Sequence, residues 1–292
     1  MNSTGTKTIH NYLSLVKFSH TIFALPFAVI GYFLAIRFTT HVFDIKLFGL
    51  IILCMVFARS AAMAFNRYID KHIDAANERT AIREIPSGAI QPSSALVFVI
   101  INCLLFIATT YFINTICFYL SPIALAVVLG YSFTKRFTTL CHLILGVGLS
   151  LAPIGAYLAV TGEFNLLPLL FSFAVLFWVS GFDIIYALQD EEFDKSKNLK
   201  SIPVALGKQK ALALSSLLHI ISATFIVYAG LYANFAMWYW IGTSIFIGLL
   251  YYQHTLVKPN DLSKVNIAFF TTNGIASVIF STFVLIDLYI NK

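Results

Sequence analysis

Long apolar stretches, repeated along almost the whole chain, constrain its fold more than any other feature of the sequence. Nine of them have the length, about 17–25 residues, at which a helix crosses the hydrocarbon core of a bilayer. They occupy residues 16–36, 46–65, 94–112, 115–133, 141–161, 165–186, 211–232, 235–252 and 266–289. Charged residues make up only 11% of the chain, against about 25% in soluble domains. The sequence therefore predicts a single all-α domain over residues 1–292, a polytopic membrane bundle of nine transmembrane helices.

The basic residues predict how this bundle is oriented in the lipid bilayer. With the N-terminus inside, sixteen of the 19 Lys and Arg residues fall on the cytoplasmic side, and only Arg37, Lys46 and Lys292 fall on the other. Short cytoplasmic loops of membrane proteins carry such an excess. The bias predicts a multi-pass protein of the bacterial inner membrane, or an equivalent membrane, with a cytoplasmic N-terminus. The net charge of +6 then reflects orientation and does not indicate nucleic-acid binding.

Acidic residues concentrate in two short segments. Nine of the thirteen lie in residues 70–84 and 183–194, and both segments follow apolar spans on the predicted cytoplasmic side. On a helix, two steps of four residues stay within about 80° of arc, so side chains at this spacing share a face. The residues so placed are Asn66, Asp70 and Asp74 in the first segment, and Tyr186, Asp190 and Asp194 in the second. Mg²⁺ takes one or two carboxylates together with phosphate oxygens and water. The alternative is a pair of solvated helix ends, salt-bridged to nearby basic residues.

The two acidic segments also resemble each other. Placing Asp70 on Asp190 puts Asp74 on Asp194, which corresponds to an internal repeat of about 120 residues. Such a repeat would bring the two acidic helix ends together across a pseudo-symmetric bundle. Two facing carboxylate clusters can hold two Mg²⁺ ions on one diphosphate, and the predicted site therefore lies on the cytoplasmic side.

Further charged candidates lie near these segments or inside the spans. The basic ones are Arg79, Arg83, Lys135 and Arg136. Each can bind a diphosphate or an aromatic carboxylate, and Arg can do so with two parallel hydrogen bonds. The alternative for each is a residue that only sets membrane orientation. His20 lies inside the first span, where ionisable side chains usually face the bundle interior, and His142 receives the same interpretation with less weight.

Four segments give the chain a likeness to a known family. They are NRYIDKHID at 66–74, REIPSG at 83–88, YSFTKRFTTLCH at 131–142 and DIIYALQDEEFD at 183–194. The two aspartate segments resemble the paired motifs of the UbiA superfamily of intramembrane prenyltransferases. The third resembles the loop of its 4-hydroxybenzoate polyprenyltransferase branch. Two positions depart from the family pattern, because Arg67 stands where many relatives have Asp and Ser132 stands where a proline is common.

The resemblance implies roles for individual residues. It implies that Mg²⁺ and diphosphate are held by Asn66, Asp70, Asp74, Asp190 and Asp194. Lys135 and Arg136 would contact the diphosphate or the aromatic acid, with Arg79, Arg83 and Tyr186 also placed to bind substrate. Tyr131 and Asp183 would line the pocket, and Asp183 or a diphosphate oxygen would accept the ring proton.

The expected activity is Mg²⁺-dependent transfer of a polyprenyl group to a ring carbon of a hydroxylated aromatic acid in quinone biosynthesis. A 4-hydroxybenzoate-type acceptor is the first choice, and a hydroxynaphthoate of menaquinone synthesis is the alternative acceptor. A secondary transporter is the rival class, since transporters are also polytopic bundles with repeats. Transporters tend to bind their substrate near the bilayer midplane, whereas the acidic residues here gather at the ends of spans. A membrane scaffold without activity is the third interpretation.

Overall fold

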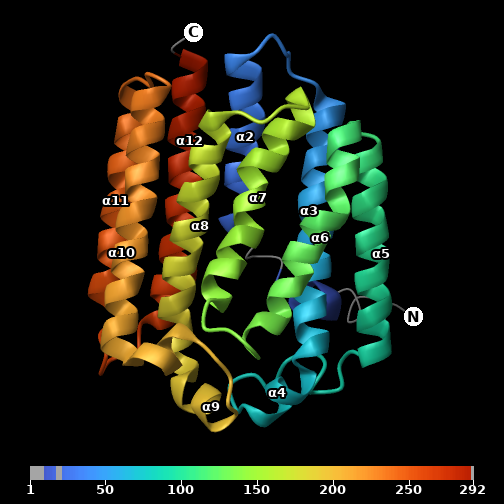
Figure 1. Ribbon diagram of the computed structural model, residues 1–292, viewed down its shortest axis with the longest axis vertical. Helices are drawn as coiled ribbons and strands as arrows, with labels where there is room; N and C mark the ends of the chain where they lie inside the picture. Colours follow the sequence, from blue (N-terminus) through green and yellow to red (C-terminus); the bar gives the residue numbers. More distant parts are fainter. Residues whose placement is uncertain (1–9, 18–21, 291–292) are drawn as a thin grey trace.

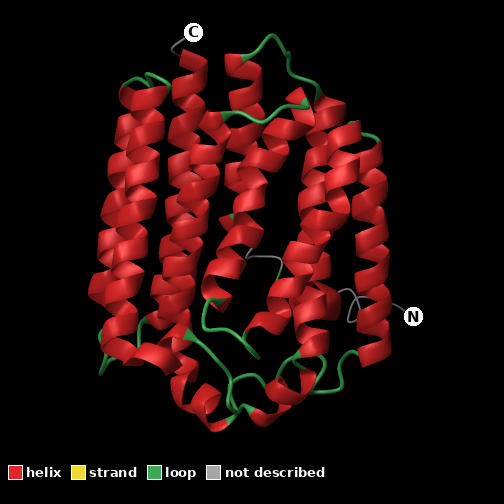
Figure 2. Cartoon of the chain, in the orientation of Figure 1, coloured by secondary structure: helices red, strands yellow, loops and turns green. Residues whose placement is uncertain are grey.

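The computed structural model describes residues 10–17 and 22–290, and the long helices run side by side as one bundle (Figure 1). Helices account for most of the described chain, and the loops that join the long helices lie at the two ends of the bundle (Figure 2). After a short helix at residues 10–15, the chain forms α2 (Leu25–Phe38), α3 (Ile45–Ile69), α4 (Lys71–Ala76), α5 (Pro92–Tyr111), α6 (Thr115–Thr134) and α7 (Cys141–Thr161). The rest are α8 (Leu166–Ala187), η2 (Leu188–Asp190), α9 (Glu191–Ser196), α10 (Ile202–Tyr232), α11 (Met237–Leu256), the π-helical η3 (Ile267–Thr272) and α12 (Asn273–Ile290).

The prediction of an all-α membrane bundle is confirmed, but the count of nine spans is not met in full. Within the described residues, seven helices are long and apolar enough to cross a membrane. The first predicted span corresponds to α2, which has only 14 residues because Pro26 lies in its first turn and favours a helix start there. The eighth corresponds to α11, which has 20 residues and falls outside those seven because Trp, Tyr, Gln and His lower its hydropathy.

α8 forms the centre of the bundle, where it packs against α7 and α10. In its most apolar stretch 67% of residues are buried inside the protein, against 17% for the peripheral α6. The fully buried Trp178 of α8 donates from Nε1 to Asn273 Oδ1 of α12 at 2.9 Å, which satisfies the indole N–H away from water. This fixed central helix carries Asp183 and Tyr186 to one end of the bundle.

The two acidic segments share a local geometry that differs from the single continuous helix expected for each. α3 ends at Ile69, Asp70 takes φ −90° and ψ 7°, and the six-residue helix α4 follows. Similarly, α8 ends at Ala187 and the 3-10 turn η2 leads to Asp190, which takes φ −100° and ψ 2°. The six-residue helix α9 follows. The expectation that each acidic set shares one face of an unbroken helix is therefore wrong at these two aspartates.

The matching breaks are what an internal repeat predicts, because they fall at the two aspartates that the proposed duplication superimposes. Asp74 and Asp194 then occupy the same position in α4 and α9, and they are only 4% and 1% exposed. α4 and α9 lie beside each other at the bottom of Figure 1. The prediction that the acidic ends converge is confirmed.

α10 begins well before the span predicted at residues 211–232. It starts at Ile202 after an N-cap at Ser201, and its backbone breaks at Gly207, where φ is +74°. Glycine adopts this conformation without the steric cost that a side chain would add. The early start places the first backbone N–H of α10 next to α7, at the end of the bundle that holds the acidic segments.

Candidate active site

A polar cavity of about 550 Å³ lies at the end of the bundle that carries α4 and α9. Its walls contain every candidate residue named from the sequence that falls within the described chain. These are Asn66, Asp70, Asp74, Arg79, Arg83, Tyr131, Lys135, Arg136, His142, Asp183, Tyr186, Asp190 and Asp194. His20 lies outside the described residues. Side chains that span more than 120 positions of sequence therefore meet in one cavity.

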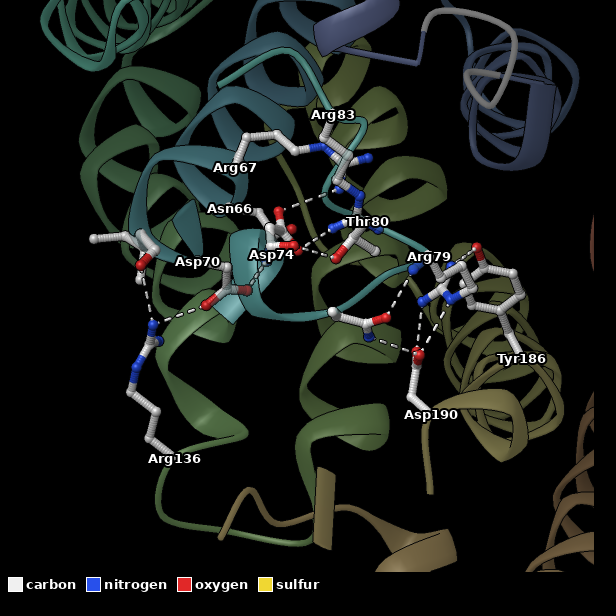
Figure 3. Close-up of polar contacts among 12 residues, drawn as sticks. Asn66, Arg67, Asp70, Asp74, Arg79, Thr80, Arg83, Arg136, Tyr186 and Asp190 are labelled. Carbon is white, nitrogen blue, oxygen red and sulfur yellow. Dashed lines mark hydrogen bonds and ion pairs between the residues drawn. The ribbon is translucent and has the colours of Figure 1, made fainter. Parts of the chain in front are cut away.

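The first acidic segment is held by basic side chains (Figure 3). Asp70 accepts hydrogen bonds from Arg136 Nη2 at 2.8 Å and from Asn66 Nδ2 at 3.1 Å. Arg83 Nη1 donates to Asp74 Oδ1 at 2.6 Å. Burial raises the pKa of the Asp70 carboxyl above its usual range, and the positive charge of Arg136 opposes that rise. The arrangement stabilises two carboxylates four residues apart by giving each its own cation.

The second acidic segment is tied to the first by Arg79, which lies in the loop after α4. Its guanidinium donates to both oxygens of Asp190, at 3.1 Å from Nε and 2.5 Å from Nη2, and to the Tyr186 hydroxyl at 2.9 Å. Asn77 adds a hydrogen bond to the same carboxylate at 3.3 Å. Burial lowers the pKa of Arg79, but the hydrogen bond and charge of Asp190 outweigh it and raise the pKa, so the cation is stabilised. Figure 3 shows these groups directed at one another.

The loop after α6 connects the two segments from the other side. Lys135 Nζ lies 2.7 Å from Asp194 Oδ2, while its neighbour Arg136 contacts Asp70 of the first segment. Burial lowers the pKa of Lys135, and the charge of Asp194 and their hydrogen bond raise it above its usual value. The backbone N–H of Lys200 also donates to the Lys135 carbonyl at 2.7 Å, which fixes this loop against the start of α10.

The carboxylates fit a Mg²⁺ site that is completed by a diphosphate. Asp74 Oδ2 is a buried oxygen without a hydrogen-bond donor among the described residues, whereas Asp194 Oδ2, in the other acidic segment, is paired with Lys135 Nζ at 2.7 Å. Within the same part of the chain, no three His, Cys, Asp or Glu residues form a cluster that could hold a metal ion. Mg²⁺ usually takes one or two carboxylates and fills its other positions with phosphate oxygens and water. The donor set is thus suited to a metal that arrives with phosphate.

Arg59 and Arg67 belong to the cavity wall but were not among the predicted site residues. Arg67 is 5% exposed and its Nη1 lies 4.0 Å from Asp74 Oδ2, so the position that departs from the family pattern adds a cation beside the first acidic segment. Arg59, Met63 and Arg67 follow one another at intervals of four residues along α3, and all three line the cavity. The available signal was the presence of two Arg inside or at the end of an apolar span, since such groups usually face the bundle interior.

An apolar cavity of about 390 Å³ adjoins the polar one and extends along α6 and α7 toward the opposite end of the bundle, where Ile113 and Phe164 line it. It lies mainly between α3, α6 and α7, and its walls are apolar apart from Arg59, Thr110, Ser121 and the Tyr131 hydroxyl. The two cavities share five lining residues, which are Arg59, Met63, Tyr131, Leu145 and Leu149. A charged compartment therefore opens into an apolar one, as required for a ligand with a charged head and a long apolar tail.

Comparison with known proteins identifies the family. Residues 24–275 match the UbiA prenyltransferase family. The chain belongs to this family. It is therefore a prenyltransferase and an integral, multi-pass membrane protein, and family membership decides against the transporter and scaffold interpretations.

Curated relatives of this UbiA family member carry a consistent name. A 4-hydroxybenzoate octaprenyltransferase of Nitrosomonas europaea is 30% identical over 246 residues, which cover 84% of each chain. A protein of the same name from Coxiella burnetii is 29% identical over 225 residues, 77% of this chain and 78% of the relative.

Solved structures of UbiA homologs share the fold. The apo structure of a homolog from Aeropyrum pernix K1 superposes with a TM-score of 0.83 at 30% identity, covering 92% of this chain and 98% of that one. A homolog from Archaeoglobus fulgidus, bound to GPP and Mg²⁺, superposes with a TM-score of 0.76 at 21% identity, covering 96% and 100%.

Proposed function

We propose that this prenyltransferase transfers a polyprenyl group from its diphosphate to a ring carbon of a 4-hydroxybenzoate-type acid, with Mg²⁺ at the two acidic segments. The observation that carries the proposal is the junction of the two cavities. The charged one presents carboxylates and basic side chains to a diphosphate, and the apolar one accommodates an isoprenoid tail. The names of the curated relatives support the acceptor, and the GPP and Mg²⁺ bound to the Archaeoglobus fulgidus homolog support the donor.

The basic side chains have a direct part in this chemistry. When the bond between the prenyl carbon and the diphosphate oxygen breaks, the electron pair leaves with the diphosphate and an allylic cation remains. Mg²⁺, when bound, supplies Lewis-acid stabilisation of that developing negative charge. Arg79, Lys135 and Arg136 already lie in the cavity as charged donors, and they stabilise the leaving group by hydrogen bonds that strengthen as its charge grows.

The acceptor reacts where the polar and apolar cavities meet. Its ring carbon, made electron-rich by the hydroxyl group, attacks the allylic cation, and the ring proton passes to Asp183 or to a diphosphate oxygen. Tyr131 and Asp183 both line the polar cavity, and Tyr131 also lines the apolar one. The apolar walls beyond Tyr131 keep water away from the cation, and each buried CH₂ of the tail contributes about 0.8 kcal/mol to binding.

The positions of the basic loops support a cytoplasmic active site. The acidic segments and the loop of Lys135 and Arg136 lie at the same end of the bundle, the end with the larger share of Lys and Arg in the sequence. A prenyl diphosphate and an aromatic acid would then both reach the site from the cytoplasmic leaflet.

Product mass spectrometry tests this function. Membranes that contain the protein are incubated with a labelled polyprenyl diphosphate, Mg²⁺ and either 4-hydroxybenzoate or a dihydroxynaphthoate. We expect a carbon-prenylated hydroxybenzoate that forms with Mg²⁺ and disappears when EDTA is added. A product from the naphthoate alone would overturn the proposed acceptor while keeping the reaction class, and an EDTA-resistant product would overturn the metal requirement.

Arg79 offers a first mutational test of the diphosphate site. Arg79→Ala removes a two-pronged donor from the cavity, and we expect the KM for prenyl diphosphate to rise by roughly 10- to 100-fold, the worth of a charged hydrogen bond. Arg79→Lys keeps the charge without the planar fork and should give an intermediate value. Steady-state kinetics at saturating acceptor provide the measurement. An unchanged KM in Arg79→Ala would remove Arg79 from the diphosphate site.

A further inference from the structure

His142 and Asp183 form a pair in the wall of the polar cavity. His142 Nδ1 lies 2.7 Å from Asp183 Oδ2, and the histidine is only 2% exposed. Asp183 belongs to the central helix α8. Its side chain is nevertheless 22% exposed, because it faces the cavity. The pair thus joins a fully buried group, carried by the first turn of α7, to a group that ligands can reach.

The start of α10 fixes which ring nitrogen of His142 is the donor. The backbone N–H of Ile202, the first residue of α10, donates to His142 Nε2 at 3.4 Å. The first N–H groups of a helix have no partner inside the helix, so the imidazole satisfies one of them. Because Nε2 accepts this hydrogen bond, Nδ1 carries the ring hydrogen and donates it to Asp183.

This arrangement leaves one oxygen of Asp183 available. Oδ2 accepts from His142, whereas Oδ1 has no hydrogen-bond donor within residues 10–17 and 22–290. The carboxylate cannot rotate freely, since rotation would break the hydrogen bond to a ring that is held by Ile202. Oδ1 is therefore held toward the polar cavity, whose wall also contains Tyr131 at the junction with the apolar cavity.

We propose that His142 is a positioning residue, which holds Asp183 so that its free oxygen accepts a hydrogen bond from the ring hydroxyl of the aromatic acceptor. This inference rests on the proposed function and assigns recognition of the acceptor's hydroxyl group to Asp183, held in place by His142. Accepting that hydrogen bond increases electron density on the ring, which favours attack on the allylic cation. His142 acts through Asp183 and does not touch the substrate.

Acceptor kinetics of His142 variants test the proposal. His142→Ala is expected to raise the KM for 4-hydroxybenzoate by at least about 10-fold and to leave the KM for prenyl diphosphate unchanged, because only the acceptor contacts Asp183. His142→Gln retains an N–H donor and should recover most of the loss. The exposed His72 supplies the control variant His72→Ala, with wild-type values for both substrates. A KM for 4-hydroxybenzoate that stays at the wild-type value in His142→Ala would overturn the proposal.

Two further measurements separate positioning from a structural role. Benzoate lacks the hydroxyl, so its inhibition constant should be equal in wild type and His142→Ala. General damage to the pocket would instead weaken the binding of both benzoate and 4-hydroxybenzoate. The double variant His142→Ala/Asp183→Asn should be no worse than Asp183→Asn alone, and additive losses would contradict action through Asp183. If His142→Ala does not fold, Asp183→Asn is compared with wild type instead. A raised KM for 4-hydroxybenzoate with an unchanged inhibition constant for benzoate would support a hydrogen bond from the acceptor hydroxyl to Asp183, and any other result would contradict it. Absence of any prenylated hydroxy acid from the wild type would instead refute the proposed function itself.

Discussion

Replacing Asp74 or Asp194 with Asn is expected to lower kcat/KM by about 10²- to 10³-fold, the usual cost of removing one group that stabilises transition-state charge. Each residue is nearly fully buried in the wall of the polar cavity. Asp74 Oδ2 has no hydrogen-bond donor among the described residues, and Asp194 Oδ2 faces the ammonium group of Lys135 at 2.7 Å. Asn keeps the shape but provides a neutral oxygen, which binds Mg²⁺ more weakly. Steady-state assays over a range of Mg²⁺ concentrations measure the loss and show how far excess metal reverses it.

Neighbouring acidic residues provide matched controls for this prediction. Glu78 follows α4, Glu192 lies in α9, and both are exposed and absent from the cavity wall. Glu78→Gln and Glu192→Gln change the local charge by the same amount and should keep wild-type activity. Equal losses in the controls and the Asp variants would mean that net charge, rather than the two buried carboxylates, governs activity.

Filling the apolar cavity is expected to change chain-length preference. Gly155 of α7 lines this cavity, and a Cβ built at the position has no heavy atom within 4 Å, so Gly155→Phe can project into the space without displacing backbone. Displacing even two CH₂ groups of the tail costs about 1.6 kcal/mol, on the order of 15-fold in binding. We therefore expect the KM for long prenyl diphosphates to rise while the KM for a short one, such as GPP, changes little.

Gly248 of α11 gives the control for a bulky residue in a membrane helix. It is exposed on the bundle surface, also has no atom within 4 Å of an added Cβ, and does not line either cavity. Gly248→Phe should leave chain-length preference unchanged. If Gly155→Phe raised the KM for GPP and for long donors equally, the apolar cavity would not be the site of the tail.

The sequence predicts the site residues better than their contacts. Charges at the ends of apolar spans identify Asp70, Asp74, Asp190 and Asp194, because a carboxylate near lipid requires a partner or a function. The repeated spacing also indicates that the two segments meet. The specific ion pair between Arg79 and Asp190 could not be predicted, since it joins residues 111 positions apart across a loop whose path depends on the whole bundle.

Backbone details also escape prediction from residue spacing. The helix breaks at Asp70 and Asp190 depend on how α4 and α9 pack over the cavity, and neither segment contains a proline or glycine to mark them. The break in α10 is marked by Gly207, yet only the folded chain shows that the early start of α10 brings Ile202 to His142. The short α2, by contrast, follows from Pro26.

Calorimetric titration of Mg²⁺ into the purified protein tests most directly whether the two acidic segments bind one Mg²⁺–diphosphate group. The titration is performed with and without a non-hydrolysable prenyl diphosphate analogue, in wild type, Asp74→Asn and Asp194→Asn. We expect strong Mg²⁺ binding in wild type only when the analogue is present, and its loss in either variant, since one carboxylate of each segment is needed. Strong binding that persists in both variants, or that does not depend on the analogue, would contradict a shared site.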